Sequence, residues 1–204
     1  MYIIGITGGT GAGKTLALNV LSDLGALTLD CDEIYHRLLL NSSDMKEEIT
    51  ANFADVLTDG NIDRKKLSKI VWKEPASLLK LNKITHKYVS SEIKRLIDEF
   101  KLQGGTITAI DAIALIESGL SKNCDIIVGI TASEKCRKSR IMKRDALGEE
   151  QAQARINAQQ QESYYKKNCD YIIENNFVTP TEFAFKCKEY FTELFSKQKP
   201  EKLK

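Results

Sequence analysis

The residues with the clearest chemical purpose form a glycine-rich segment near the N-terminus. It reads Gly8-Gly9-Thr10-Gly11-Ala12-Gly13-Lys14-Thr15 and fits the phosphate-loop pattern G-x-x-x-x-G-K-[S/T] at every required position. Glycines let successive backbone N–H groups converge on an anion, Lys14 adds positive charge at the β- and γ-phosphates, and the Thr15 hydroxyl suits Mg²⁺. The alternative is a glycine turn that contains a lysine by chance. The strand-like run 2–6 before the segment and the helix-like run that begins at Leu16 favour a nucleotide site.

Aspartates follow two of the strand-like runs. Asp30-Cys31-Asp32 ends the run 26–29, and Asp111 ends the run 106–110. In open α/β sheets the carboxyl ends of the strands face the ligand crevice. Asp32 could there accept the proton of a substrate hydroxyl, and Asp111 could hold the magnesium shell of a nucleoside triphosphate. Helix or turn capping is the alternative for each, and in the first pair one aspartate can cap while the other faces the site.

A group of arginines follows the fourth strand-like run, 126–130. Ser133 is a predicted helix N-cap, and three arginines come after it on one helical face: Arg137, Arg140 and Arg144. The next predicted helix, 149–162, adds Arg155 and Gln159. Forked guanidinium donors on a helical pair suit a lid that stabilises charge on a transferring phosphoryl group. The alternative is a solvated face that is salt-bridged to Glu134, Asp145 and Glu149.

Residues from about 41 to 102 have a helical pattern. The expected helices are 45–53, 64–72 and a long stretch 75–102, and a turn is expected at Asp59-Gly60. The apolar stripe of the long stretch drifts, which indicates a bend or break near Thr85-His86-Lys87. We interpret this segment as an all-helical insertion suited to an acceptor-substrate pocket, in which His86 is either functional or structural.

The strand-like runs alternate with helices, so the sequence predicts an α/β fold with a doubly wound parallel sheet of five strands. The last strand, 171–173, has Asn175-Asn176 as its exit turn. A short helical segment is expected to close at Glu117-Ser118-Gly119. A C-terminal helix is expected from Thr179-Pro180 to about Ser196, and the Lys-rich tail after it is expected to be frayed.

The composition excludes several classes of protein. Of the 204 residues, 42% are hydrophobic and 28% charged, and the formal net charge of +2 is too small to indicate a nucleic-acid partner. No apolar run approaches the ~18 residues of a membrane span, and no secretion signal precedes the first strand. Five widely spaced cysteines without a C-x-x-C pair, with only two histidines, make a zinc site unexpected and indicate a reduced, cytoplasmic protein.

The glycine loop by itself is compatible with a kinase, an ATPase, a GTPase or a nucleotide-gated binding protein. Guanine specificity is not expected, because Asn82-Lys83 has no Asp two positions later. The small size of the chain, the helical acceptor region and the arginine-bearing lid favour a small-molecule kinase.

Further blocks carry a family resemblance. They are Asp59-Gly60-Asn61-Ile62-Asp63-Arg64, Ile84-Thr85-His86, Glu117-Ser118-Gly119-Leu120, Arg144-Asp145, and Arg155-Ile156 with Gln159. With these blocks in this order and spacing, the chain resembles the dephospho-CoA kinases over roughly residues 2–193. The resemblance implies transfer of the ATP γ-phosphoryl group to the ribose 3′-hydroxyl of dephospho-CoA, the last step of CoA synthesis.

The resemblance also implies an architecture. It is an α/β P-loop kinase fold with a five-stranded parallel sheet flanked by helices, a helical substrate-binding insertion and a helical lid. Within this single domain of residues 1–204, the core covers about 1–40, 103–133 and 168–196. The helical CoA region covers about 41–102, and the lid covers about 134–167.

Spacing and resemblance together assign roles to individual residues. The catalytic residues are expected to be Asp32, Lys14 and Arg140. The nucleotide-binding residues are expected to be Gly8, Gly9, Thr10, Gly11, Ala12, Gly13, Lys14, Thr15 and Leu16, with Arg144 at the phosphates and Asn175 near the adenine. The acceptor is expected to contact Asp32, Arg37, His86, Asp111 and Glu117. Mg²⁺ accompanies the co-substrate ATP and is expected at Thr15 and Asp111.

Three positions depart from the family pattern. His36 stands where the family usually has an arginine, so either Arg37 replaces that substrate contact or the contact is weakened. Ile113 and Lys87 each replace a usual proline. These changes are expected to alter the geometry of the acceptor pocket and to spare the phosphate machinery.

The expected partners are ATP and dephospho-CoA, with neither nucleic acid nor membrane, in a monomer or weak homo-oligomer. Two other functions are compatible with the loop: another P-loop kinase of a nucleoside, nucleotide or sugar, and a catalytically silent nucleotide-binding regulator.

Overall fold

The structure, a computed structural model, describes residues 1–197. The chain forms two compact units: residues 1–28 and the chain from Gln103 onward make up unit 1, and Leu29–Leu102 make up unit 2. The tail predicted to be frayed lies, from residue 198 on, outside the described residues. The division into core, acceptor region and lid stays a prediction.

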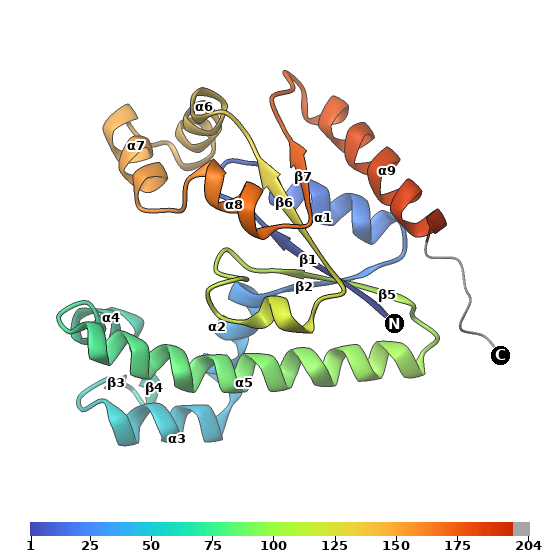
Figure 1. Cartoon of the computed structure of the whole chain (residues 1–204). Coiled ribbons are helices and arrows are strands. Elements are labelled where there is room, and N and C mark those ends of the chain that lie inside the picture. The colour runs from blue at the N-terminus through green and yellow to red at the C-terminus, as the bar shows by residue number, and fades with distance from the viewer. Residues whose placement is uncertain (198–204) are drawn as a thin grey trace. The chain divides into compact units, whose positions relative to one another are not determined.

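The main sheet has the strand order β2-β5-β1-β6-β7 (Figure 1), and all of it belongs to unit 1 except the last two residues of β2, Leu29 and Asp30. The strands are β1 Tyr2–Thr7, β2 Leu27–Asp30, β5 Ile107–Asp111, β6 Ile126–Thr131 and β7 Tyr171–Glu174. β1 pairs in parallel with β5 and β6, and β6 pairs in parallel with β7. The predicted five-stranded α/β sheet is confirmed. Because β1 is central, the segment that leaves its carboxyl end starts at the middle of the ligand-facing edge.

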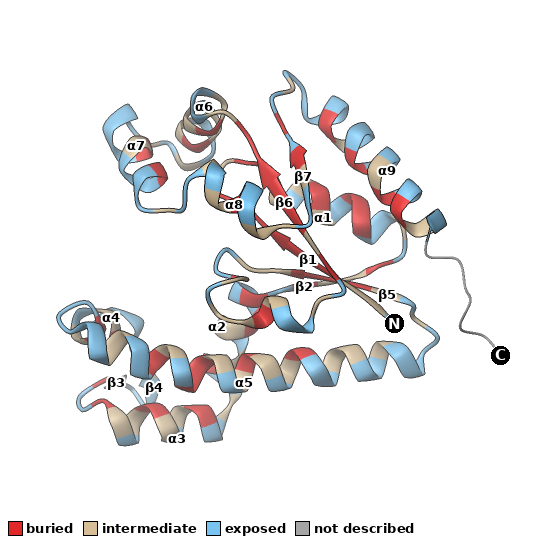
Figure 2. Cartoon of the chain, viewed as in Figure 1, coloured by how far each residue is buried: buried red, intermediate tan, exposed pale blue. Residues whose placement is uncertain are grey.

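β-Branched residues make the central strands suitable for burial on both faces. Figure 2 shows β1 and β6 as largely buried, and Ile4, Ile6, Val128 and Ile130 are solvent-inaccessible. These four side chains share one core with helices α1 (Lys14–Asp23) and α9 (Pro180–Lys197). The shared core fixes the start of α1, where the glycine segment ends.

The remaining helices of unit 1 are η1 Leu120–Asn123, α6 Glu134–Asp145, α7 Glu149–Asn157 and α8 Glu162–Asn168. The predicted cap of α6 is confirmed, since Ser133 Oγ accepts the Cys136 N–H over 3.4 Å. The prediction of one helix over 149–162 is wrong, because residues 158–161 leave the helix and place Gln159 in a turn.

The short helix expected to close at Glu117-Ser118-Gly119 is also absent. Residues 113–118 form turns, and the 3₁₀ helix η1 follows them. Ser118 N–H donates to Ala114 O and Gly119 N–H to Ile116 O, which closes one turn only. Gly119 then adopts φ +78°, a left-handed conformation that ends a helical segment.

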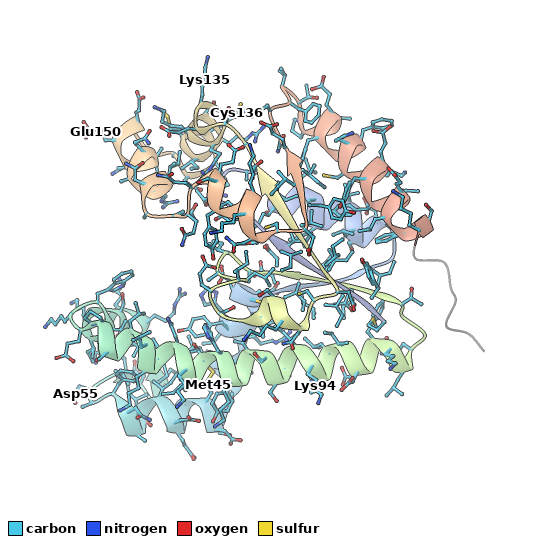
Figure 3. All side chains as sticks on the ribbon, in the orientation of Figure 1. Met45, Asp55, Lys94, Lys135, Cys136 and Glu150 are labelled. Carbon is cyan, nitrogen blue, oxygen red and sulfur yellow. The ribbon has the colours of Figure 1, made fainter. Side chains whose placement is uncertain are left out.

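Unit 2 is mainly helical, and its longest element is helix α5. Its elements are α2 Cys31–Asn41, α3 Ser43–Asn52, β3 Leu57–Thr58, β4 Asn61–Ile62, α4 Arg64–Val71 and α5 Pro75–Leu102. Figure 1 shows α3 and α4 beside α5, and Figure 3 shows Met45 between α3 and α5. Met45 and Ile49 of α3 are solvent-inaccessible and share a core with Leu67 of α4 and Ile84 of α5.

Two expectations for unit 2 are wrong. The stretch 75–102 has no break near Thr85-His86-Lys87, because α5 is continuous over its 28 residues. Three helices, α2, α3 and α4, pack against α5, so its apolar side chains need not form one straight stripe. The insertion is also not all-helical, because Asp59-Gly60 is the turn of an antiparallel hairpin between β3 and β4.

No helix within residues 1–197 is long and apolar enough to cross a membrane.

Candidate functional site

The glycine segment connects the carboxyl end of β1 to the first turn of α1. Gly13, the residue before α1, has φ +111°, which side-chain-bearing residues rarely adopt. A Cβ there would lie 2.3 Å from Asn175 Nδ2. Glycine is therefore needed at this position for both conformation and space.

The segment offers unused donors at the start of α1. The N–H groups of Gly11 and Gly13 donate to no oxygen within residues 1–197. Lys14 Nζ donates to Gly8 O over 3.0 Å, and the side chain of Thr15 is exposed. Backbone donors, an ammonium group and a helix N-terminus together favour an anion.

The carbonyl groups of the same segment are engaged from outside. Thr10 O accepts from Arg137 Nε over 2.9 Å, Gly11 O from Arg140 Nη1 over 3.2 Å, and Ala12 O from Asn175 Nδ2 over 2.8 Å. Three successive peptide groups are thus held by their oxygens. The predictions for Arg140 and Asn175 placed them at the nucleotide and did not include these bonds to the loop.

The arginines predicted to lie on one face have different partners. Arg140 Nη2 donates to Asn175 O over 3.0 Å and to Phe177 O over 3.3 Å. Arg144, in contrast, is exposed and pairs with Asp145 over 2.7 Å, and Arg155 pairs with the same carboxylate. The salt-bridged alternative therefore describes Arg144 and Arg155, whereas Arg140 lies against the loop.

A cavity of about 660 Å³ opens beside this part of the loop. Its lining includes Gly13, Leu16, Arg140, Asn175 and Phe177. Apolar and ring atoms next to a few polar groups suit a flat heteroaromatic ring. The predicted base-side residue Asn175 is buried at the back of this cavity, where its amide is committed to the loop.

The two acidic residues of unit 1 that were predicted for the site, Asp111 and Glu117, lie in different places. Asp111 pairs opposite Ile6 in the β5–β1 register, so it stands at the carboxyl edge next to the start of the loop. Glu117 is hydrogen-bonded to Tyr164 and lines a cavity of about 330 Å³ together with Gln159 and Tyr165.

The other predicted site residues belong to unit 2. The capping alternative is confirmed for Asp30. The strand ends at Asp30, whose side chain caps α2 by accepting the N–H groups of Asp32 and Glu33 over 2.8 and 3.1 Å. Asp32 is exposed in the first turn of α2. Arg37 pairs with Glu92 over 3.0 Å, and partial burial lowers the pKa of His86.

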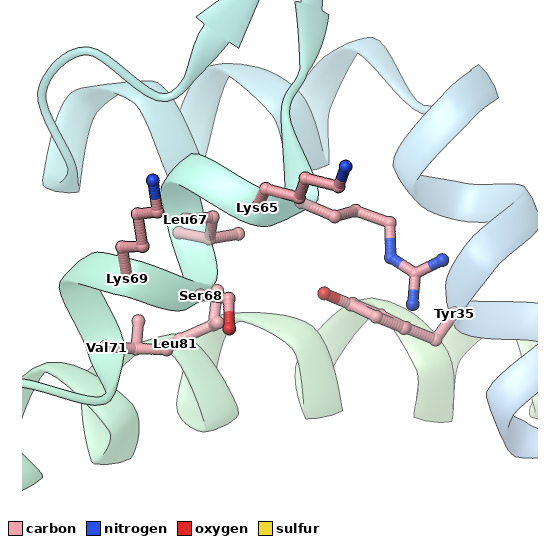
Figure 4. Close-up of a pocket in the computed structure, with 8 residues that line it drawn as sticks. Tyr35, Lys65, Leu67, Ser68, Lys69, Val71 and Leu81 are labelled. Carbon is pink, nitrogen blue, oxygen red and sulfur yellow. The ribbon is translucent and has the colours of Figure 1, made fainter.

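Unit 2 contains a basic pocket; an acceptor pocket was expected in this segment, but the residues that line this one were not predicted. Its volume is about 750 Å³, and α4 supplies Arg64, Lys65 and Lys69 to its lining. Tyr35 extends its hydroxyl from α2 toward α4, and Leu67, Val71 and Leu81 form the apolar part (Figure 4). None of the three cations pairs with a carboxylate in the described part of the chain.

The surroundings of the pocket shift the pKa of Tyr35. Burial raises the pKa of Tyr35, and the positive charge of Arg64 acts in the opposite direction. An anion attached to an apolar group fits such a lining. The only sequence signal for the pocket was the basic run Arg64-Lys65-Lys66, which also suits a solvated helix face.

Comparisons with known proteins agree with one another. A family model described as dephospho-CoA kinase matches residues 2–180. A dephospho-CoA kinase of Dehalococcoides mccartyi is 38% identical over 178 residues, which are 86% of this chain and 89% of the relative. A solved dephospho-CoA kinase from Campylobacter jejuni matches with a TM-score of 0.68 and 25% identity, over 96% of this chain and 98% of that one. A protein from Thermus thermophilus matches with a TM-score of 0.78 over 98% of both chains, and at 24% identity it supports the fold alone.

Proposed function

The chain belongs to the dephospho-CoA kinase family, and we propose on that premise that it phosphorylates the 3′-hydroxyl of dephospho-CoA with ATP and so forms coenzyme A. One observation supports this proposal above all. In the glycine loop, the carbonyl oxygens of residues 10–12 accept hydrogen bonds from side chains, whereas the N–H groups of Gly11 and Gly13 are unused. The chain is accordingly an ATP-dependent phosphotransferase that acts on an alcohol group.

The donor half of the reaction is assigned to unit 1. Residues Gly8–Leu16 bind the phosphates of ATP, and Lys14 places its charge at the β- and γ-phosphoryl groups. Arg140 and the exposed Arg144 attend the phosphates, and Arg144 must exchange its pairing with Asp145 to do so. The base occupies the cavity beside Leu16, Asn175 and Phe177.

Mg²⁺ is assigned to Thr15 and Asp111. Within the described residues there is no group of three or more acidic, histidine or cysteine side chains able to hold a metal ion. This fits magnesium, which binds through one or two protein oxygens, substrate phosphates and water. Thr15 and Asp111 would hold the ion, which would supply positive charge to neutralise the phosphates of ATP.

The acceptor half is assigned to Asp32, Arg37, His86, Asp111 and Glu117. Asp32 accepts the proton of the 3′-hydroxyl while that oxygen bonds to the γ-phosphorus and the bond to the bridging oxygen of ADP breaks. Within residues 1–197 the carboxylate of Asp32 takes part in no hydrogen bond and no ion pair. The carboxylate of Asp30, in contrast, caps α2. The other residues act by positioning the acceptor.

We assign the diphosphate and the attached arm of dephospho-CoA to the basic pocket of unit 2. The diphosphate meets Arg64, Lys65 and Lys69, and the arm lies on Leu67, Val71 and Leu81. Replacement of both Lys65 and Lys69 by Ala should raise the KM for dephospho-CoA about tenfold and leave the KM for ATP unchanged. Lys66→Ala is the matched control, because Lys66 Nζ donates instead to Leu57 O over 2.8 Å. Equal effects in the two proteins would remove this assignment.

Product analysis tests the function as a whole. Incubation with Mg-ATP and dephospho-CoA should yield, by mass spectrometry, an acceptor that carries one additional phosphoryl group. Coenzyme A itself is the control acceptor and should remain unchanged, because its 3′-position is already phosphorylated. Turnover of a nucleoside or sugar in place of dephospho-CoA would favour another P-loop kinase, and ATP binding without any transfer would favour a regulator. We also assign the protein to the cytoplasm, as a monomer or weak homo-oligomer.

A further inference from the structure

Thr10 of the glycine loop is held at both of the peptide groups that flank it, by two residues that lie far from it in the sequence of unit 1. Its N–H donates to Gln159 Oε1 over 2.7 Å, and its carbonyl oxygen accepts from Arg137 Nε over 2.9 Å. Arg137 Nη2 also donates to Gln159 Oε1 over 3.1 Å. The three groups form a closed arrangement, the Thr10 clamp, made of Thr10, Arg137 and Gln159.

Arg137 is unusual among the lysines and arginines of residues 1–197 because it is only 8% exposed. It pairs with no carboxylate within residues 1–197, and burial lowers its pKa. Its hydrogen bonds run to a carbonyl oxygen and an amide oxygen instead. Burial of a guanidinium group without a carboxylate partner costs free energy of folding, which suggests that Arg137 has a functional role.

The loop sequence is adapted to this guanidinium group. A Cβ at Gly9 would lie 2.4 Å from Arg137 Nη2, so a larger residue there would displace the guanidinium group from its present position. The Thr10 N–H is used in the clamp, whereas the N–H groups of Gly11 and Gly13 are left for a ligand. The clamp therefore engages the N–H group of Thr10 and leaves those of Gly11 and Gly13 unused.

We propose that Arg137 and Gln159 are positioning residues for the phosphates of the nucleotide. They hold the N–H and carbonyl groups of Thr10 so that the N–H groups of Gly11 and Gly13 point at the phosphates. Because Gln159 lies in the turn between α7 and α8, this arrangement depends on that turn. Affinity for phosphate groups is thereby coupled to the packing of α6, α7 and α8. The inference rests on the proposed function only in that ATP is the ligand of the loop.

The chemistry of Gln159 provides a discriminating pair of variants. Its Oε1 acts only as an acceptor in the clamp. Gln159→Glu keeps an acceptor at this place, and its charge is offset by Arg137. Gln159→Leu removes the acceptor at similar volume. Gln153→Leu is the matched control, because Gln153 bonds to Glu134 and Asn157 in the same region and does not contact the loop.

The test compares the dissociation constants of ATP and adenosine for the full chain by calorimetry, with adenosine measured by competition. Gln159→Leu should weaken ATP binding about tenfold, the loss expected for one hydrogen-bonding group, and leave adenosine binding unchanged. Gln159→Glu and Gln153→Leu should bind ATP within about twofold of the unmodified protein.

Several results would overturn the proposal. They are equal losses for ATP and adenosine in Gln159→Leu, unchanged ATP binding in that variant, or a loss in Gln159→Glu as large as that in Gln159→Leu. A thermal melt of each variant separates general unfolding from a loss confined to phosphate binding. If dephospho-CoA is not phosphorylated but the difference between ATP and adenosine persists, the proposed function fails and the clamp stands.

Discussion

The side chains of Arg140 and Asn175 are hydrogen-bonded to each other, with 3.1 Å between Arg140 Nη2 and Asn175 Oδ1. Each also reaches the glycine loop, Arg140 at Gly11 O and Asn175 at Ala12 O. The pair therefore joins the first helix after β6 and the turn after β7 to two successive peptide groups of the loop, one for each residue. Changes at either residue should reach the nucleotide through the loop.

Asn175→Ala should destabilise the protein and weaken nucleotide binding together. Asn175 is buried, and its loss leaves Ala12 O without its donor, which costs about 1–3 kcal/mol of unfolding free energy. Denaturant unfolding and ATP titration of the same protein measure both effects. Asn176→Ala is the control at the exposed neighbouring position. A stable Asn175→Ala protein with normal ATP affinity would show that the bond to Ala12 is dispensable.

Lys14→Ala should reduce kcat by about 10²–10³, the usual effect of removing one group that stabilises transition-state charge. The apo protein should remain folded, because Lys14 Nζ contacts Gly8 O at the surface of the loop. Initial rates with Mg-ATP and dephospho-CoA provide the measurement, with the exposed Lys122→Ala as control. Normal turnover of Lys14→Ala would exclude this lysine from the chemistry.

Asp32→Asn should reduce kcat by about 10²–10⁴, the range for loss of a general base, while the Kd for ATP stays nearly unchanged. The amide keeps the size of the carboxylate and loses its basicity. Glu33→Gln, in the same exposed helical turn, is the control for a lost charge. Turnover at the unmodified rate in Asp32→Asn would remove Asp32 from the mechanism.

Arg140→Ala and Arg144→Ala should separate two kinds of contribution. Arg140→Ala should lower kcat more than it lowers stability, although it also removes donors to Gly11 O and Asn175. Arg144→Ala should raise the KM for ATP and leave the unfolding midpoint unchanged, because exposed ion pairs such as Arg144–Asp145 contribute little. Parallel losses of rate and stability in Arg140→Ala would assign it a structural role alone.

His86 should make the stability of the protein depend on pH. Partial burial lowers its folded-state pKa below the unfolded value of about 6.5. The unfolded chain then binds the extra proton first, so stability is fully present above pH ~6.5 and falls as the pH drops through the folded-state pKa. His86→Gln should lose less stability than the unmodified protein between neutral and mildly acidic pH in urea titrations. Identical pH dependence of the two proteins would contradict this assignment.

Local signals in the sequence predicted much of the fold. The glycine loop, the five strands of the sheet and the caps at Ser133 and Asp30 each depend on a few adjacent residues. The hairpin of β3 and β4 was missed because strands of two residues have no detectable periodicity. The continuity of α5 was missed because its apolar stripe follows three different helices, which only the tertiary packing shows.

The site was predicted as a set of residue types and not as a set of contacts. Arg137 was identified only as a member of an arginine face, and Gln159 only as a residue of the second lid helix and of a family block. The bonds that give them a role join Thr10 to residues 127 and 149 positions away. A local sequence pattern does not predict such bonds, because the partners are far apart in the sequence and many polar side chains could make the same bond.

The outer hydrogen bonds of the glycine loop have a consequence for biosynthesis. Residues 10–12 emerge from the ribosome early, but the donors that hold their carbonyl oxygens are Arg137, Arg140 and Asn175. The nascent loop therefore lacks its partners until most of the chain has been translated. A ribosome-bound fragment that ends before Asn175 carries the complete phosphate-loop sequence without the contacts that shape it for ATP.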